Sequence, residues 1–417
     1  MNPYTAPVAS IATAPSRLVV FDDIFPHPLS SFRFAEFTGL LDAFPNASVH
    51  TSGSVLPSIA PGLEISELIK SHVNIFPEHR DRIQAFHPGA SLAGKTAYCV
   101  FFHNICSILE VLNRDKTPFV FTLYPGGGFY LNESHTDESL KRVFASPNFR
   151  TVIATQPLTR NYLIDKGLCD TERIQFIFGG VLPPPNLLSL PEKQFYGIHK
   201  KTVDVCFAAW RYMPLGRDKG YDTFVLVAKR LARRFDAVHF HVVGPWDEKE
   251  IDVSVLAERI HFHPPMSSTD LKVFFRRMDL IVSPNRPFTL TPGKFDGFPS
   301  GCCVEAGLSG VAVCATDELK QNGPFTNGRD ILITSVGAEE IAEVVGNAIS
   351  DYDGLTELAN KGQAAFSQVF GWTTQMGPRL EVLSRLQSLP VAAQVPAPRP
   401  VPPLPDLTVP ANHASGV

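Results

Sequence analysis

The residues best suited to chemistry lie between Lys294 and Thr316. A loop rich in glycine and proline leads into a segment of small residues, and an apolar run over 311–316 predicts a buried strand. The amides at a helix N-terminus bind phosphate oxygens, and a nearby carboxylate accepts hydrogen bonds from ribose hydroxyls. The stretch therefore predicts a nucleotide or nucleotide-sugar site, while leaving open that its carboxylates are ordinary surface charges. Its candidate binding residues are Asp296, Gly297, Phe298, Ser300, Gly301, Cys302 and Glu305.

The first half of the chain offers a weaker set of candidates at predicted strand ends. Ser30 and Ser31 follow the strand expected over 18–21, and His103 follows one expected over 96–102. A third strand, over 118–123, runs into Tyr124 and a glycine triplet that includes Gly126 and Gly127. Three glycines permit close approach of the backbone to a ligand, but they fit neither a Walker A loop nor a dinucleotide fingerprint. Turn chemistry and ordinary packing explain these residues equally well.

The composition limits the classes of protein to which the chain can belong. The chain has 417 residues, 44% of them hydrophobic and 19% charged, with a formal net charge of −4. This length fits two domains, and the charge gives no reason to expect a nucleic-acid partner. Seven cysteines without regular spacing indicate thiols in a reducing compartment, and we find neither a signal peptide nor a membrane span. We therefore expect a cytoplasmic protein whose membrane contact, if it has any, is peripheral.

Strand and helix patterns alternate in both halves, which predicts two facing α/β domains with parallel sheets. Further strands are expected over 150–155 and 174–178 in the first half, and over 203–208, 238–243, 260–263, 279–283 and 330–334 in the second. The expected domains are 1–182 and 201–370, joined by a proline-containing linker over 183–200. A last helix is expected over 371–389, followed by a disordered proline-rich tail over 390–417.

The second half resembles the retaining glycosyltransferases of the two-Rossmann-domain (GT-B) type, and is most similar to glycosyltransferase family 4. Arg211 and Lys219 resemble the family's pair of cations, although the spacing is longer than usual and makes Arg217 a rival for the arginine. Residues 240–244, ending at Gly244, resemble its apolar strand, and residues 296–305 resemble its acidic loop. Gly371 and Trp372 resemble the start of its closing helix, which crosses back onto the first domain.

This resemblance implies roles for individual residues. Arg211 and Lys219 would clamp the donor diphosphate as catalytic cations, Glu305 would bind ribose hydroxyls, and His103 would touch the donor sugar. Ser30 and Ser31 stand where the family has a glycine pair, and Tyr124 stands where it commonly has a histidine. The family places its two acidic residues eight positions apart, and counting back from Glu305 reaches Gly297. Either the loop therefore carries one extra residue or Asp296 does not fill the first acidic position.

The implied reaction moves a sugar from a nucleoside diphosphate sugar to an acceptor hydroxyl with retention of configuration, as in glycan or polysaccharide synthesis. Such enzymes do not usually need a metal or a cofactor. The acceptor would be a glycan, a lipid-linked glycan or a small molecule, and the sequence selects neither the nucleotide nor the sugar. Two alternatives remain open: a nucleotide-sugar epimerase of the same fold, and a non-catalytic relative that binds nucleotide sugars.

Overall fold

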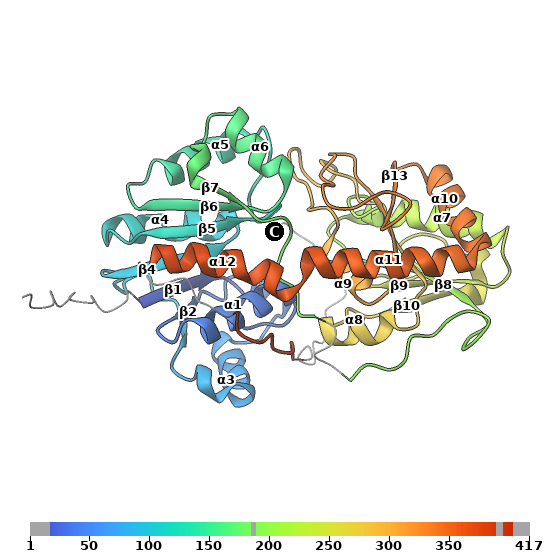
Figure 1. Cartoon of the computed structure of the whole chain (residues 1–417), viewed down its shortest axis with the longest axis horizontal. Coiled ribbons are helices and arrows are strands. Elements are labelled where there is room, and N and C mark those ends of the chain that lie inside the picture. Colours follow the sequence, from blue (N-terminus) through green and yellow to red (C-terminus); the bar gives the residue numbers. More distant parts are fainter. Residues whose placement is uncertain (1–16, 185–188, 389–394, 403–417) are drawn as a thin grey trace, which may run out of the picture.

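The chain folds into two α/β domains, each built on one parallel sheet (Figure 1). The computed structural model describes residues 17–184, 189–388 and 395–402. The first sheet has the strand order β3-β2-β1-β4-β5-β6-β7, and the second has the order β10-β9-β8-β11-β12-β13. In both sheets the order reverses beside the first strand of the domain. Parallel α/β sheets bind ligands beyond the carboxyl ends of the strands at such a reversal.

The elements of the first domain alternate as the sequence pattern indicates. Its strands are β1 (Arg17–Asp22), β2 (Ser48–Thr51), β3 (Ile83–Ala85), β4 (Lys95–Val100), β5 (Phe119–Leu123), β6 (Phe149–Ala154) and β7 (Ile174–Phe176). Its helices are α1 (Ser31–Ala43), α2 (Leu56–Ile59), α3 (Ile65–Ile75), η1 (Pro77–His79), α4 (Phe102–Arg114), α5 (Ser134–Phe144), α6 (Pro157–Asp165) and η2 (Thr171–Arg173).

The second domain repeats this plan. Its strands are β8 (Val203–Ala208), β9 (Val238–Val243), β10 (Ile260–His263), β11 (Leu280–Ser283), β12 (Ala312–Thr316) and β13 (Leu332–Thr334). Its helices are η4 (Pro214–Gly216), α7 (Tyr221–Ala232), η5 (Ser254–Arg259), α8 (Ser268–Phe275), α9 (Gly301–Leu308), α10 (Ala338–Ser350) and α11 (Tyr352–Phe370), and α12 (Trp372–Leu386) follows. None of the helices in the described part of the chain is long and apolar enough to span a membrane.

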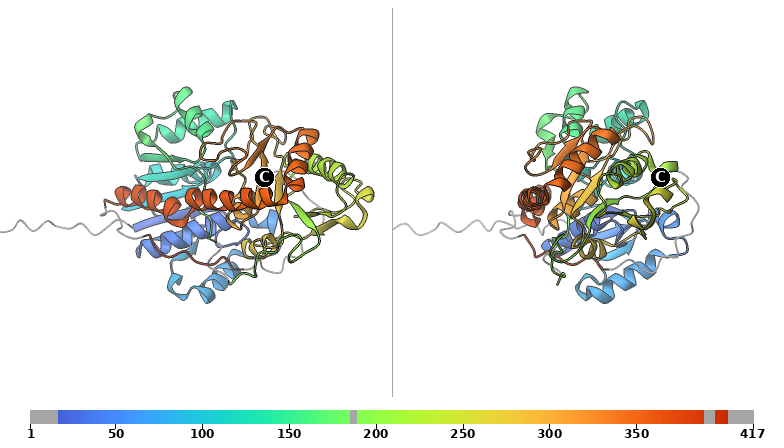
Figure 2. Two further views of the ribbon diagram at one scale, coloured as in Figure 1. Left: turned by 45° about the vertical axis from the view of Figure 1, so that its right-hand side comes forward. Right: turned by 90° about the vertical axis from the view of Figure 1, so that its right-hand side faces the viewer.

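The last two helices run across both domains (Figure 1), and the turned views of Figure 2 show them along one side of the molecule. Helix α11 packs on the second domain, whereas Trp372, Met376 and Leu380 of α12 join the core of the first. Arg379 fixes this crossing because its guanidinium is fully buried beside Glu36, with Nε 3.7 Å from a carboxylate oxygen. It also donates to the Tyr124 hydroxyl at 3.2 Å. The crossing helix is thus anchored by a buried ion pair.

The fold class expected from the sequence is confirmed, but the first domain contains more elements than expected. The sequence pattern passes directly from the first helix to the strand at residue 96, whereas the structure has β2, α2, α3, η1 and β3 between them. The two missed strands have only 4 and 3 residues, and β2 is a polar sequence, Ser-Val-His-Thr. Such short strands carry too few positions to show an alternating pattern.

The prediction of a disordered tail over 390–417 is wrong for residues 395–402, and the rest of that range lies outside the described residues. Val401 is buried, and its carbonyl accepts a hydrogen bond of 2.8 Å from Thr269 of the second domain. The Trp372 indole donates to the Pro396 carbonyl at 2.6 Å. Arg399 completes the attachment to the first domain. Specific polar contacts therefore hold this segment despite its low-complexity composition.

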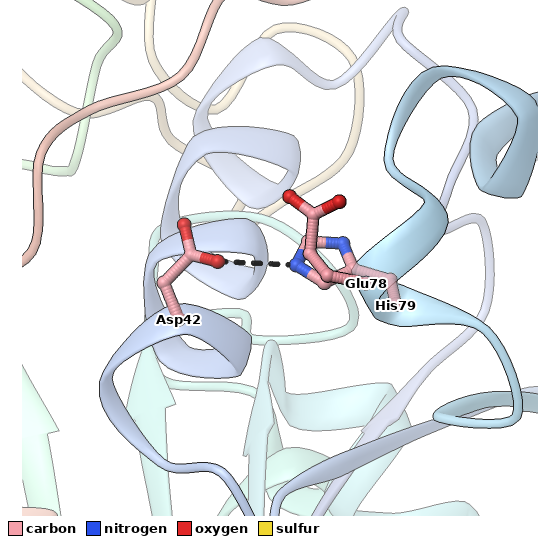
Figure 3. A group of neighbouring side chains, drawn as sticks. All are labelled: Asp42, Glu78 and His79. Carbon is pink, nitrogen blue, oxygen red and sulfur yellow. Dashed lines mark hydrogen bonds and ion pairs between the residues drawn. The ribbon is translucent and has the colours of Figure 1, made fainter.

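Arg399 binds a carboxylate pair that superficially resembles a metal site. Asp42, Glu78 and His79 point toward one another (Figure 3), with ligand atoms within 4.8 Å of each other. The Arg399 guanidinium donates to both oxygens of Asp42, at 2.5 and 2.8 Å, and also to Glu78. The tail thus supplies the cation that balances these carboxylates.

A ladder of histidines along the outer strands of the second sheet predicts acid sensitivity. His239 faces His261 at 3.0 Å and His241 faces His263 at 3.1 Å, while His241 also contacts Asp204. Burial, with neighbouring His241, His261 and Arg277, lowers the pKa of His263 to about 4. The unfolded chain, with a histidine pKa near 6.5, therefore binds more protons between those values, so stability falls as pH drops from about 6.5 to about 4.

We expect the unfolding temperature to fall by several degrees between pH 7 and pH 5, and to fall less in His263→Gln, which removes one titrating ring. Differential scanning fluorimetry over a pH series measures both curves. Identical pH profiles for the wild type and this variant would exclude His263 as a source of acid sensitivity.

Candidate functional site

A cavity of about 490 Å³ lies between the two domains, at the carboxyl ends of their strands. Ser31, Phe32, Phe101 and Tyr124 line it from the first domain. The second domain contributes the loops after β8, β9 and β11 together with the start of α9. The predicted site residues that line the cavity are Ser31, Tyr124, Lys219, Gly244, Asp296, Gly297, Ser300, Gly301, Cys302 and Glu305. Its size suits a small-molecule substrate.

Lys219 is the cation of this cavity that comes from the loop after β8. Its ammonium donates to Asp296 at 2.6 Å, and Asp296 also accepts from Asn285 at 3.0 Å. Burial opposes the charge on Lys219, but the Asp296 carboxylate reverses this effect and raises the pKa of the lysine above its ordinary value. Lys219 is therefore charged at neutral pH and available to a phosphate group.

Glu305 lies on the buried wall of the cavity, within α9. One of its carboxylate oxygens accepts from the Ser268 hydroxyl at 2.8 Å and from the Ser31 hydroxyl at 3.0 Å. Burial raises the pKa of Glu305, while buried Lys272 and the two serines act in the opposite direction. The carboxylate thus already accepts two hydroxyl groups, one from each domain, which is the kind of partner that a sugar diol would offer.

The start of α9 adds backbone donors to the same wall. Ser300 is the residue before the helix, and no acidic side chain lies in the first turn. The first amides of a helix have no carbonyl partner within it, so they can bind an anion. Ser300, Gly301 and Cys302 all line the cavity, which Lys219 also lines. Phe298, by contrast, is buried in the core of the second domain.

Arg211 is not among the described residues that line this cavity. Its guanidinium donates instead to Glu250, beyond the end of β9. The other oxygen of Glu250 accepts the Leu215 amide, so Arg211 helps to hold the long loop before α7. The extended spacing seen in the sequence thus coincides with a change in what this arginine contacts.

His103 lies in the first turn of α4 rather than at a strand end, and it does not line the cavity within the described residues. Its ring contacts Asp23 at 2.7 Å and the Gly127 carbonyl at 2.9 Å. Burial disfavours the charged ring, but the hydrogen bond to Asp23 reverses this effect and raises the pKa of His103. The ring is 40% exposed, so it remains accessible beside the site.

Ser30 and the glycine loop have structural partners. The Ser30 hydroxyl accepts from Arg33, which also pairs with Asp22 and Asp23. Gly127 has φ of 56°, and a Cβ there would lie 2.5 Å from the Phe101 ring. Gly126 forms a bridge with Phe129. These glycines therefore serve a tight turn against Phe101, whereas Tyr124 lines the cavity and bonds to Glu36 at 3.2 Å.

The loop between β11 and α9 contacts the first domain directly. The Leu131 amide donates to the Gly293 carbonyl at 2.9 Å. Phe295 is 2% exposed and packs in the core of the first domain, with its ring 5.8 Å from that of Phe129. The residues at 293 and 295 thus attach a loop of the second domain to the first.

Sequence reasoning missed Ser268, Lys272, Tyr212 and Lys294. Ser268 begins the helix after β10. Its position beyond the carboxyl end of a parallel strand, where ligands bind, could have identified it from the sequence. Tyr212 follows the β8 strand and lies between Arg211 and Lys219 in sequence, and its ring lines the cavity. Lys272 lies near Glu305 and Lys294 lies beside the Tyr212 ring, and neither lysine carries a motif that marks it.

Residues 204–351 match the family model described as Glycosyl transferases group 1. This stretch contains Lys219, Asp296 and Glu305. Over these residues the chain is similar to the group 1 glycosyltransferases. The comparison with curated protein sequences gave no match.

The chain has the GT-B fold, as comparison with solved structures shows. HepE of Anabaena, in complex with UDP and glucose, superposes with a TM-score of 0.62 at 18% identity, covering 88% of this chain and 100% of HepE. Sucrose-phosphate synthase of Thermosynechococcus elongatus gives 0.60 at 14% identity, covering 89% and 99%. TarM of S. aureus gives 0.51 at 17% identity, covering 70% of this chain and 55% of TarM. The expected resemblance to glycosyltransferases of this fold is confirmed.

Proposed function

We propose that this protein is a retaining glycosyltransferase that transfers a hexosyl group from a nucleoside diphosphate sugar to an acceptor hydroxyl. One observation carries the proposal: Lys219, the N-terminus of α9 and Glu305 line a single cavity between two domains. The diphosphate would lie against Lys219 and the helix amides, and the ribose against Glu305. Because HepE binds UDP and UDP-glucose in its solved complexes, UDP-sugars are the first donors to test.

In this reaction the bond between the anomeric carbon and the diphosphate oxygen breaks, and the acceptor oxygen forms the new bond on the same face of the sugar. The acceptor hydroxyl passes its proton to the departing diphosphate. The departing diphosphate develops negative charge, which Lys219 and the α9 amides are positioned to stabilise in a closed cleft. His103, held by Asp23, is accessible beside the site and would contact the donor sugar. The reaction proposed here uses no metal ion.

The contacts across the cleft fit a site that assembles on domain closure. Ser31 of the first domain bonds to Glu305 of the second, and Phe295 of the second packs in the core of the first. Closure of two domains over a substrate excludes water and completes a site in many enzymes. A donor that enters this cavity would compete with Ser31 for Glu305. We place the product in glycan or polysaccharide synthesis, in the cytoplasm.

A nucleotide screen tests the proposal. We expect one nucleoside diphosphate among UDP, GDP, ADP and TDP, and its sugar, to raise the unfolding temperature, because a ligand that binds only the folded state stabilises it. Incubation with the sugar and a mixture of candidate acceptors should then release the nucleoside diphosphate, and NMR of the product should show an unchanged anomeric configuration.

Other outcomes would distinguish the alternatives. An isomerised nucleotide sugar without nucleotide release would identify an epimerase. Binding without release or isomerisation across all acceptors would indicate a non-catalytic relative. The absence of stabilisation by all four nucleotides and their sugars would contradict the proposed donor class.

A further inference from the structure

We propose that Lys294 is a phosphate-binding residue that acts with Lys219 on the donor diphosphate, in the place that the sequence suggests for Arg211. This inference rests on the proposed function, because it assigns a binding group to the same donor. It concerns the β11–α9 loop, which the sequence singled out for its carboxylates and not for its lysine.

The two lysines share one aromatic side chain. Lys219 Nζ lies 5.2 Å from the centroid of the Tyr212 ring, and Lys294 Nζ lies 5.3 Å from it. Tyr212 lines the cavity and is 42% exposed. Lys294 is not itself among the lining residues, but two ammonium groups beside one ring that lines the cavity form a local concentration of positive charge. Such a concentration suits a ligand with two adjacent phosphates.

The charges around this pair are incompletely balanced. Asp296 pairs with Lys219 and also accepts from Asn285. Lys294 makes no ion pair and no side-chain hydrogen bond within residues 17–184, 189–388 and 395–402. The other nearby acid is Asp218, which is buried and whose pKa is raised by that burial. Burial and the neighbouring Lys219 lower the pKa of Lys294, in keeping with a cation that lacks its own counterion.

The backbone on both sides of Lys294 is fixed. Gly293 accepts from Leu131 of the first domain, and Phe295 is buried in that domain's core. Lys219, in contrast, is carried by the loop that precedes α7 of the second domain. In this structure the ammonium groups of Lys219 and Lys294 share the Tyr212 ring while the β11–α9 loop is attached to the first domain. A diphosphate that binds both would favour that attachment, which links donor binding to closure.

Arg211 cannot easily take the same role. Its guanidinium is bound to Glu250, which also holds the Leu215 amide, so recruiting it would leave that carboxylate and the loop without their partner. Lys294 requires no such exchange. The structure thus favours a lysine pair over the family's arginine and lysine.

The test compares binding of a nucleoside diphosphate and of its nucleoside to four neutral variants by isothermal titration calorimetry. The probes are UDP and uridine, or the corresponding pair if the nucleotide screen selects another base. We expect Lys294→Met and Lys294→Gln to weaken UDP binding at least tenfold while leaving uridine binding within twofold. Arg211→Gln and the matched control Lys361→Gln, an exposed lysine of α11, should leave UDP binding within about threefold.

Three outcomes would overturn the inference. The first is that both Lys294 variants bind UDP like the wild type. The second is that Arg211→Gln loses the affinity and the Lys294 variants keep it. The third is that the Lys294 variants slow transfer to an acceptor with unchanged UDP affinity, which would assign this lysine to an anionic acceptor. If the wild type itself binds none of the nucleotides, the proposed function fails, independently of Lys294.

Discussion

Replacement of Lys219 by alanine is expected to reduce kcat/KM for sugar transfer by about 100-fold or more. The side chain is mostly buried, positively charged and located at the cavity. Preorganised charges that stabilise a leaving group typically contribute about 10²–10³ in rate. Initial rates of nucleoside diphosphate release, measured over a range of donor concentrations, give the effect. Glu305→Ala is expected to have a similar effect through loss of the ribose acceptor.

Thermal unfolding of these variants distinguishes a loss of catalysis from a loss of stability. Lys219→Ala removes one partner of Asp296, but that carboxylate keeps Asn285 and is 36% exposed, so the unfolding temperature should change by only a few degrees. Lys361→Ala is the matched control and should retain wild-type rates. Full activity of both Lys219→Ala and Glu305→Ala would contradict the proposed site.

Replacement of Arg379 by methionine is expected to have the largest effect on stability. Arg379 and Glu36 are both fully buried, and removal of one member of a buried ion pair costs about 3–5 kcal/mol because the other charge is left without its partner. For a protein of this kind the unfolding temperature should fall by roughly 10 °C. Helix α12 should also loosen from the first domain, which hydrogen exchange of residues 372–386 would detect.

Two variants test the cause of that loss. Arg385→Met lies on the exposed side of the same helix and should change the unfolding temperature little. Combining Arg379→Met with Glu36→Gln removes the stranded charge and keeps an acceptor oxygen for one of the two tyrosines, Tyr98 or Tyr124, so it should recover part of the stability. An unfolding temperature of Arg379→Met within 1 °C of the wild type would mean that the pair does not hold the crossing helix.

The periodicity of the sequence was sufficient to predict the architecture and the residues on one wall of the site. Buried strands such as β8 and β11 are mostly apolar, and the loops that follow them carry Lys219 and Asp296. Glu305 could be located because a helix of small residues follows the same strand. These features are local in sequence, so a single chain reveals them.

The remaining features depend on contacts between distant residues. Arg211 has the residue type and the approximate position of a phosphate ligand, yet Glu250, 39 residues later, takes its guanidinium. The bond between Ser31 and Glu305 spans 274 positions and exists only because the two domains meet. Lys294 carries no motif of its own, since its position is defined by Tyr212 and Lys219 on the separate loop after β8. No local pattern contains this information.

The attachment of Arg399 matters to anyone who shortens the protein. The proline-rich composition after residue 390 makes this a natural position at which to truncate the chain. A chain that ends there would lose the guanidinium that lies between Asp42 and Glu78. Two carboxylates would then face each other beside a histidine, and the Thr269 hydroxyl next to Ser268 would lose its acceptor. A truncated protein would thus differ from the full chain close to the cavity between the domains, so affinities and rates measured on it would not represent the full chain.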